Sequence, residues 1–316
     1  MSVDAETRSQ LVAHARAAIK HGSQSFSAAS QLFDSETRER AWLLYAWCRQ
    51  CDDIADNQEL GGELGDQSDL NDRLAHIRRL TALAFEGKPT GNPAFDALGV
   101  VAQECGLTLQ MAEDVIAGFA LDADDWRPRS EADMMRYCYH VAGAVGVMMA
   151  VVMGVDPGDQ DTLDRANDLG LAFQLSNIAR DIVEDDAAGR CYLPINWLVE
   201  QDIEPGQHTK PHHREELAEM AARLVALVEK HEAAARVGAE RLPFRSRWAV
   251  LAAARIYGAI GRKVRDRGTG AWNSRTVVPR WEKAAYGVRA FLSAAINREK
   301  HPDGEITWGI ADFRPA

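Results

Sequence analysis

Hydrophobic residues recur at helical spacing along almost the whole chain, so the pattern predicts a protein built from α-helices. Stretches rich in Gly, Pro and Asp interrupt the pattern, as in QELGGELGDQSD at 58–69 and DIEPGQHTKPHH at 202–213. No segment alternates convincingly with a period of two, which argues against strands. The predicted helices span about residues 4–20, 35–57, 70–86, 93–105, 108–122, 130–153, 160–186, 212–240, 245–267 and 279–297.

The domain organisation follows from length and from the absence of linkers in the sequence. With 316 residues the chain could hold one large domain or two ordinary ones. It has no repeat of solenoid length and no low-complexity linker. We therefore expect one all-α domain over 1–316, with about 299–316 as an irregular C-terminal tail.

Composition narrows the class of protein. The chain is 46% hydrophobic and 26% charged, which is typical of a soluble globular protein. Its net charge of −11 argues against nucleic-acid binding, which needs clustered Lys and Arg. Five cysteines without dense spacing favour a reducing compartment over a disulfide scaffold. The N-terminus has no apolar secretory region, and the longest apolar run, 141–155, is too short to span a bilayer. We expect a cytoplasmic protein, with peripheral membrane contact left open.

Polar residues form a stripe along one predicted helix, in the segment QLSNIARDIVEDD at 174–186. Gln174, Asn177, Asp181 and Asp185 stand at offsets 0, 3, 7 and 11. At about 100° per residue these offsets fall within an arc of about 80°. The surrounding residues are apolar, so two amides and two carboxylates line one face of a helix that should be largely buried.

A second predicted helix repeats the arrangement in YAWCRQCDDIADNQ at 45–58. Tyr45, Arg49, Asp52 and Asp56 stand at offsets 0, 4, 7 and 11, and the helix again opens with apolar residues. Either Asp-x-x-x-Asp pair alone could belong to a solvated face. Four carboxylates near a core, however, are costly unless a cation neutralises them.

Magnesium ions could neutralise the carboxylates of two such helices, because Mg²⁺ prefers oxygen ligands and bridges carboxylates to substrate phosphates. We therefore hypothesise a Mg²⁺-bridged diphosphate site between two facing Asp-x-x-x-Asp helices. Such a site suits ionisation of an allylic diphosphate to a carbocation, with Arg49 and Arg180 as natural diphosphate contacts. The carbocation would then need a dry pocket with aromatic faces.

Five motifs together resemble the squalene/phytoene synthase family of head-to-head prenyl synthases, and within it the bacterial phytoene synthases. They are GSQSFSAASQLFD (22–34), LYAWCRQCDDIAD (44–56), YCYHVAGAVG (137–146), FQLSNIARDIVEDDAAGRCYLP (173–194) and AARIYGAIGRKVRDRG (253–268). The resemblance implies an all-α isoprenoid-synthase bundle with a central substrate cavity. It also implies Mg²⁺, or Mn²⁺, as cofactor, and two geranylgeranyl diphosphates condensed to phytoene through prephytoene diphosphate, the entry to carotenoids.

The same resemblance assigns roles to individual residues. It implies metal ligands at Asp52, Asp56, Asn177, Asp181 and Asp185. It implies contacts to the diphosphates or adjacent substrate atoms at Ser23, Ser25, Tyr45, Arg49, Gln174, Arg180, Tyr257 and, on a looser match, Arg275. Tyr137 would lie near the reacting carbons and would act with the aspartates and Arg49 as the catalytic set. Some relatives carry His directly before the Ser-x-Ser-Phe element, whereas here Gly22 holds that position and His21 precedes it.

Other interpretations stay open or are excluded by the sequence. A relative that uses farnesyl diphosphate to make dehydrosqualene or squalene is the first alternative, because tail length depends on tunnel depth. A non-catalytic helical scaffold is the alternative from another class, against which the intact aspartate pairs argue. A di-iron bundle needs Glu-x-x-His pairs, and the chain has none. The CxxC at 48–51 is interpreted as packing, and the small residues of 141–155 as core, tunnel wall or both. Oligomeric state is left open.

Overall fold

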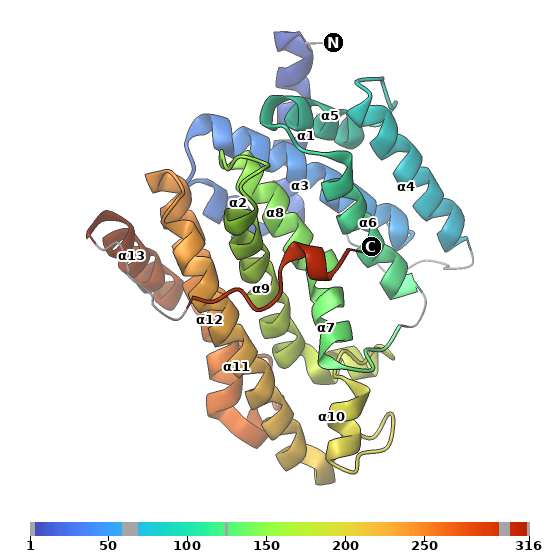
Figure 1. Cartoon of the computed structure of the whole chain (residues 1–316), viewed down its shortest axis with the longest axis vertical. Coiled ribbons are helices and arrows are strands. Elements are labelled where there is room, and N and C mark those ends of the chain that lie inside the picture. Colours follow the sequence, from blue (N-terminus) through green and yellow to red (C-terminus); the bar gives the residue numbers. More distant parts are fainter. Residues whose placement is uncertain (1–3, 59–68, 124–125, 297–303, 315–316) are drawn as a thin grey trace. The chain divides into compact units, whose positions relative to one another are not determined.

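The computed structural model describes residues 4–58, 69–123, 126–296 and 304–314, and within these ranges the regular elements are all helical, which confirms the predicted class (Figure 1). The α-helices are α1 (Ala5–Gly22), α2 (Gln24–Ser30), α3 (Ser35–Ala55), α4 (Leu70–Phe85), α5 (Pro93–Cys105), α6 (Leu109–Ala123), α7 (Glu131–Cys138), α8 (Ala144–Val152), α9 (Gln160–Ala187), α10 (Ile195–Glu200), α11 (Arg214–Ala239), α12 (Phe244–Arg267) and α13 (Arg280–Ile296). A π-helical turn, η1 (Tyr139–Gly143), joins α7 to α8.

The contacts divide the chain into two compact units, each described by itself. The first unit comprises Met1–Asp124 and Val147–Gln160, and the second comprises Asp125–Gly146 and Asp161–Ala316. The single domain expected over 1–316 stays a prediction.

In the first unit, α3 is the central helix and packs against α1 and α5, while α4 packs against α5 and α6. Its apolar residues Leu43, Leu44 and Trp47 are buried, and the Trp47 indole donates a hydrogen bond to Thr81 of α4 at 3.4 Å. The helix begins at its N-cap Asp34, whose carboxylate accepts from the backbone of Thr37. Buried packing and a defined N-terminus therefore orient the helix that carries Asp52 and ends at Asp56.

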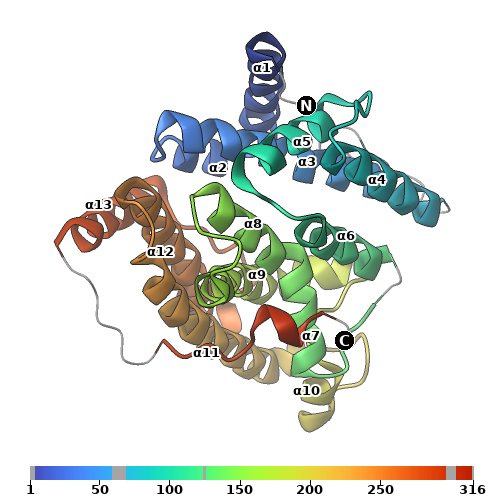
Figure 2. The same ribbon diagram turned by 45° about the horizontal axis from the view of Figure 1, so that its top comes forward.

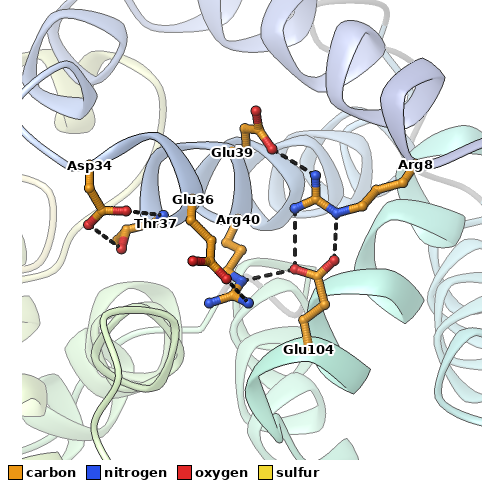
Figure 3. Close-up of polar contacts among 7 residues, drawn as sticks. All are labelled: Arg8, Asp34, Glu36, Thr37, Glu39, Arg40 and Glu104. Atoms are coloured by element: carbon orange, nitrogen blue, oxygen red, sulfur yellow. Dashed lines mark hydrogen bonds and ion pairs between the residues drawn. The ribbon is translucent and has the colours of Figure 1, made fainter. Parts of the chain in front are cut away.

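An ion-pair network ties three helices of this unit together at the surface (Figure 3). Arg8 of α1 contacts Glu39 of α3 at 2.7 Å and Glu104 of α5 at 2.6 Å. Arg40 of α3 reaches Glu104 from the other side at 2.9 Å and also pairs with Glu36. Two guanidinium groups thus share one carboxylate.

In the second unit, α11, α12 and α13 lie side by side (Figures 1 and 2). A buried pair links α11 to α9, with His231 Nδ1 2.5 Å from Asp168 Oδ1. The indole of Trp272, which follows α12, donates to the carbonyl of Ala179 in α9 at 3.1 Å. At Gly170 the backbone of α9 meets that of η1 so closely that a Cβ would lie 2.5 Å from the Ala142 carbonyl oxygen. Glycine is required there.

The C-terminal segment 304–314 is irregular apart from one short turn, but it is fixed to the second unit. Arg165 donates to the carbonyl of Gly304 at 2.7 Å, and Asn167 donates to that of Trp308 at 3.1 Å. The ring of Phe313 stacks on Tyr139 with centroids 4.8 Å apart. Residues 299–303 and 315–316 of the predicted tail lie outside the described residues.

The apolar run that starts at residue 141 is part of a longer helical stretch. Within the described residues, Glu131–Val152 is the one stretch long and apolar enough to cross a membrane, with 22 residues. However, 67% of its most apolar window is buried in the protein, which is typical of a core helix. Its small residues Gly143 and Gly146 also lie against Asn167 and Ala166 of α9, as close helix packing requires.

Candidate functional site

The polar stripe predicted on 174–186 lies on α9, a continuous helix of 28 residues. Gln174, Asn177, Asp181 and Asp185 are all partly exposed, whereas Leu175, Ile178, Ala179 and Ile182 between them are buried. The helix is thus apolar on the face that packs into the second unit and polar along the predicted stripe.

Asp181 is held by two arginines that are far apart in the sequence. Arg180 donates through Nε to Asp181 Oδ1 at 2.8 Å and through Nη2 to Oδ2. Arg275, in the segment after α12, approaches the same carboxylate at 3.0 Å. The hydrogen bond to Asp181 raises the pKa of Arg180 above its ordinary value, so it stays charged. Two guanidinium groups around one carboxylate leave positive charge available for an anion.

Asp185 lies one turn further along, in a more enclosed position. Burial, together with the charge of Asp181, raises the pKa of its carboxyl group to about 6. It lines a small pocket of the second unit with Ile178, Ile182, Arg190, Cys191, Tyr192, Leu193 and His208. A carboxylate in such surroundings is stabilised by any cation that approaches it.

Two groups of stacked aromatic rings lie in the second unit, and one of their members, Tyr192, lines the pocket of Asp185. Tyr257 of α12 stacks on Phe173 of α9 with centroids 4.0 Å apart. Tyr137 of α7 stacks on Tyr192 at 4.7 Å and on Trp126 at 5.6 Å. Tyr137 and Tyr257 were expected from the resemblance. Their ring partners could not be identified from the sequence, because the contacts join segments up to 84 residues apart.

The second acidic pair lies on α3, in the first unit. Arg49 bonds Asp52 at 2.6 Å and Asp53 at 3.0 Å. Asp53, which is off the predicted stripe and was not singled out, is thus a second partner of Arg49. Asp56 is the C-cap of α3 in helical geometry, with its amide bonded to the Asp52 carbonyl, so the predicted stripe runs to the last turn of the helix.

The Ser-x-Ser-Phe element starts α2 and lies near α3. The Ser23 hydroxyl accepts from the Phe26 amide at 3.2 Å, which is the bond expected of an N-cap. The side chain of Ser25 lies outside the described residues. A Cβ at Gly22 would clash with the hydroxyl of Tyr45, so glycine there leaves room for that tyrosine. His21 is exposed and contacts the Ala17 carbonyl of its own helix.

Metal-binding capacity depends on the donor atoms available. Among the described residues, no group of three or more His, Cys, Asp or Glu side chains is close enough to hold a metal ion. Mg²⁺, however, needs only one or two carboxylates, because it retains water and takes the remaining oxygens from substrate phosphate. The amide of Asn177 and the carboxylates of Asp181 and Asp185 fit that requirement on α9, and Asp52 and Asp56 fit it on α3.

The predicted residues therefore form two sets, one in each unit. The structure brings Arg180, Asp181 and Arg275 into contact in the second unit, and it brings Arg49 and Asp52 into contact in the first. The ligand roles of these residues stay predictions.

Comparisons with known proteins agree with the motif assignment. A family model described as squalene/phytoene synthase matches residues 19–282. The phytoene synthase of Pseudescherichia vulneris is 45% identical over 277 residues, which cover 87% of this chain and 89% of that protein. The 15-cis-phytoene synthase of Pantoea ananas is 42% identical over 295 residues, covering 92% and 95%.

Solved structures share the fold. A dehydrosqualene synthase in complex with ligand superposes with a TM-score of 0.78 at 25% identity, covering 90% of this chain and 96% of that one. The squalene synthase from Alicyclobacillus acidocaldarius superposes with a TM-score of 0.75 at 23% identity, covering 84% and 97%.

Proposed function

The chain belongs to the squalene/phytoene synthase family, and from that premise we propose that it is a phytoene synthase. It joins two geranylgeranyl diphosphates head to head, releases diphosphate and forms phytoene through prephytoene diphosphate. The observation that carries this proposal is the near full-length identity of 42–45% to bacterial enzymes of that name.

We propose Mg²⁺ as the cofactor, with Mn²⁺ as a substitute. Asn177, Asp181 and Asp185 would hold metal on α9, and Asp52 and Asp56 would hold it on α3. When bound, the metal neutralises the leaving diphosphate. The donor chemistry of both helices supports this assignment, since every proposed ligand presents an oxygen atom.

The protein's own groups complete the handling of the diphosphates. Arg180 and Arg275 are charged and lie at Asp181, where each can donate to diphosphate oxygens. Arg49 is placed in the same way at Asp52. We assign Ser23, Ser25, Tyr45, Gln174 and Tyr257 to contacts with the diphosphates or nearby substrate atoms.

Ionisation also needs an environment that excludes water from the carbocation. Tyr137 is buried and stacked against Tyr192 and Trp126. We propose that Tyr137 lies near the reacting carbons, where an aromatic environment stabilises positive charge.

The test is a product analysis with paired substrates. Purified protein is incubated with Mg²⁺ and either geranylgeranyl or farnesyl diphosphate, and the products are identified by carbon number. We expect a C40 hydrocarbon from the C20 substrate and much slower turnover of the C15 substrate. A C30 product made preferentially would support the dehydrosqualene or squalene alternative. No diphosphate release from either substrate would support the non-catalytic scaffold.

We also propose a cytoplasmic location with peripheral membrane contact, because the hydrocarbon product of this reaction dissolves in a bilayer and not in water. Cell fractionation tests it: protein found in the membrane fraction and released by high salt agrees, whereas export from the cell contradicts it.

A further inference from the structure

The outward face of α13 carries a continuous apolar stripe. Trp281, Val288 and Leu292 have exposed fractions of 72%, 62% and 48%. Ala285 and Ala295 are exposed between and beyond them. At about 100° per residue these five positions fall within an arc of about 80°, so they form one line along the helix.

The opposite face of α13 is already bound to α12. Tyr286 packs against the cluster of Ala259, Ile260 and Val278, and Trp248 donates to the Gly287 carbonyl at 2.8 Å. Lys263 pairs with Glu282 at 2.6 Å. These contacts fix which face points outward, so exposure of the stripe is a property of the packed helix.

Aromatic rings extend the stripe onto the start of α12. Phe291 is 41% exposed and meets Phe244 of α12 edge to face with centroids 5.6 Å apart. Phe244 is itself 42% exposed. Together with Trp281 at the other end of α13, these rings make an apolar surface of the kind found on helices that lie in a membrane interface.

The charges beside the stripe are basic, although the whole chain carries −11. Arg280 and Arg289 are exposed and flank the stripe on its two sides. The single acid of α13, Glu282, lies on the same side of the helix as Arg289 by helix geometry, but it is already engaged by Lys263 and by the Tyr286 hydroxyl. A local basic edge on an acidic protein favours an anionic partner.

We propose that this surface, the α13 stripe (Trp281, Ala285, Val288, Leu292 and Ala295 with Phe244 and Phe291), docks onto a bilayer containing anionic lipid. The apolar side chains enter the acyl boundary, and Arg280 and Arg289 bind lipid phosphates. This inference rests on the proposed function and deepens it, because a C40 hydrocarbon product must leave the enzyme into a lipid phase.

A second copy of the chain suits the surface less well. A two-fold contact through the stripe would bring α13 against its own copy, because such interfaces are self-complementary. Arg289, next to Val288 in the middle of the helix, would then approach the Arg289 of the other copy. The single acid of α13, Glu282, is already paired with Lys263 and the Tyr286 hydroxyl, so it does not balance that repulsion.

Vesicle binding by the full-length protein tests the proposal. Phosphatidylcholine vesicles with and without phosphatidylglycerol are mixed with the parent protein and with Val288→Glu, and the bound fraction is measured by flotation. We expect salt-sensitive binding that requires phosphatidylglycerol, and a partition coefficient lowered roughly tenfold by Val288→Glu. The matched control is Val199→Glu on α10, because Val199 is equally exposed at 65%; it should bind within about twofold of the parent.

A charge reversal provides the second arm. Arg289→Glu should weaken binding to phosphatidylglycerol vesicles by about tenfold or more, since each basic residue near an anionic surface contributes about 1 kcal/mol. Arg129→Glu changes the net charge equally at another exposed arginine and should have little effect. Equal binding of the α13 variants and their controls overturns the proposal, as does equal binding to pure phosphatidylcholine. Loss of a dimer in Val288→Glu without any loss of lipid binding also overturns it.

Activity in detergent without vesicles separates this proposal from the proposed function. Val288→Glu should release diphosphate from geranylgeranyl diphosphate at the parent rate under these conditions. Turnover by a parent protein that fails to bind vesicles overturns the docking surface alone. Vesicle binding by a parent protein that forms no phytoene overturns the proposed function alone.

Discussion

Asp181 and the two arginines around it are the residues of the second unit whose contacts point most specifically to anion binding. A lone carboxylate would be satisfied by Arg180, which already donates two bonds. Arg275 is mostly solvent-accessible, with its side chain 53% exposed, yet it also points at Asp181. Exposed ion pairs add little to stability, so the position of Arg275 is better explained by binding of an anion than by folding.

Replacing Arg275 tests that explanation. Arg275→Ala should lower kcat/KM for geranylgeranyl diphosphate by about 10- to 100-fold, the effect of losing a charge-assisted hydrogen bond to diphosphate. The urea midpoint should barely change, because the side chain is exposed. Arg265→Ala is the matched control, since Arg265 forms an exposed ion pair with Glu229 on a neighbouring helix. Equal activities of the two variants would remove Arg275 from the site.

The sequence predicted residues that share a helix face better than it predicted partners. The four stripe residues Gln174, Asn177, Asp181 and Asp185 lie on one helix, α9, and Tyr45, Arg49 and Asp52 lie on another, α3. Helix periodicity fixes the direction of side chains on one element. Arg275 and Asp181 are 94 residues apart in the sequence, and helix periodicity cannot predict a contact between residues so far apart. Asp53 was missed although it stands four residues after Arg49, a spacing at which helical side chains pair, because only the Asp-x-x-x-Asp pair of Asp52 and Asp56 was considered.

At the scale of elements, the long amphipathic helices were predicted within a few residues, whereas the short ones were not. α2 and α10 have seven and six residues, too few for a periodic pattern to stand out. The π-helical turn η1 also gave no signal, since its residues fit an α-helix equally well. It lies where Gly143 and Gly170 allow two backbones to touch, and π-turns of this kind often lie at functional sites.

The close backbone contact at Gly170 leads to a prediction that can be tested against a second helical glycine, Gly287, which has free space around it in the described part of the chain. Gly170→Ala should lower the free energy of unfolding by about 2 kcal/mol or more, because its Cβ would overlap the backbone of Ala142 and Gly143. Gly287→Ala on α13 should instead stabilise the protein by up to about 1 kcal/mol, since alanine is the better helix former. Within the described residues, nothing lies within 4 Å of a Cβ at Gly287. Urea unfolding of both variants measures the difference, and equal free energies would contradict the close approach.

The network that joins α1, α3 and α5 predicts a dependence on pH (Figure 3). Burial opposes ionisation of Glu104, but hydrogen bonds from Arg8 and Arg40 bring its pKa below the ordinary value of 4.5. A lowered pKa in the folded protein means that the carboxylate adds stability above pH 4.5, and that this contribution is lost as the pH falls through the lowered pKa. Glu104→Gln should therefore be less stable than the parent at neutral pH, with a gap that closes under acid.

Urea unfolding across that pH range measures the gap. In an Arg8→Gln/Arg40→Gln background, Glu104→Gln should cost little at any pH, because the partners that lower the pKa are gone. A gap that stays constant with pH in the parent background would contradict the ion-pair account.

At the scale of the whole molecule, the proposed metal ligands are divided between the two compact units. Asp52 belongs to the first unit and Asp181 to the second. Residues that act as parts of one catalytic machinery are not additive, so removing either should remove most of the rate.

This division of the ligands gives the last prediction. Asp52→Asn and Asp181→Asn should each lower turnover by roughly a hundredfold or more, because each removes a charged oxygen ligand and leaves a side chain of the same shape. The double variant should be no slower than the worse single variant by more than a few-fold. Glu184→Gln, which changes an exposed acid beside the α9 stripe, should keep near-normal turnover. Rates are measured as diphosphate release over a range of Mg²⁺ concentrations, with circular dichroism to confirm folding. Losses that simply multiply in the double variant would show that the two acidic pairs work independently.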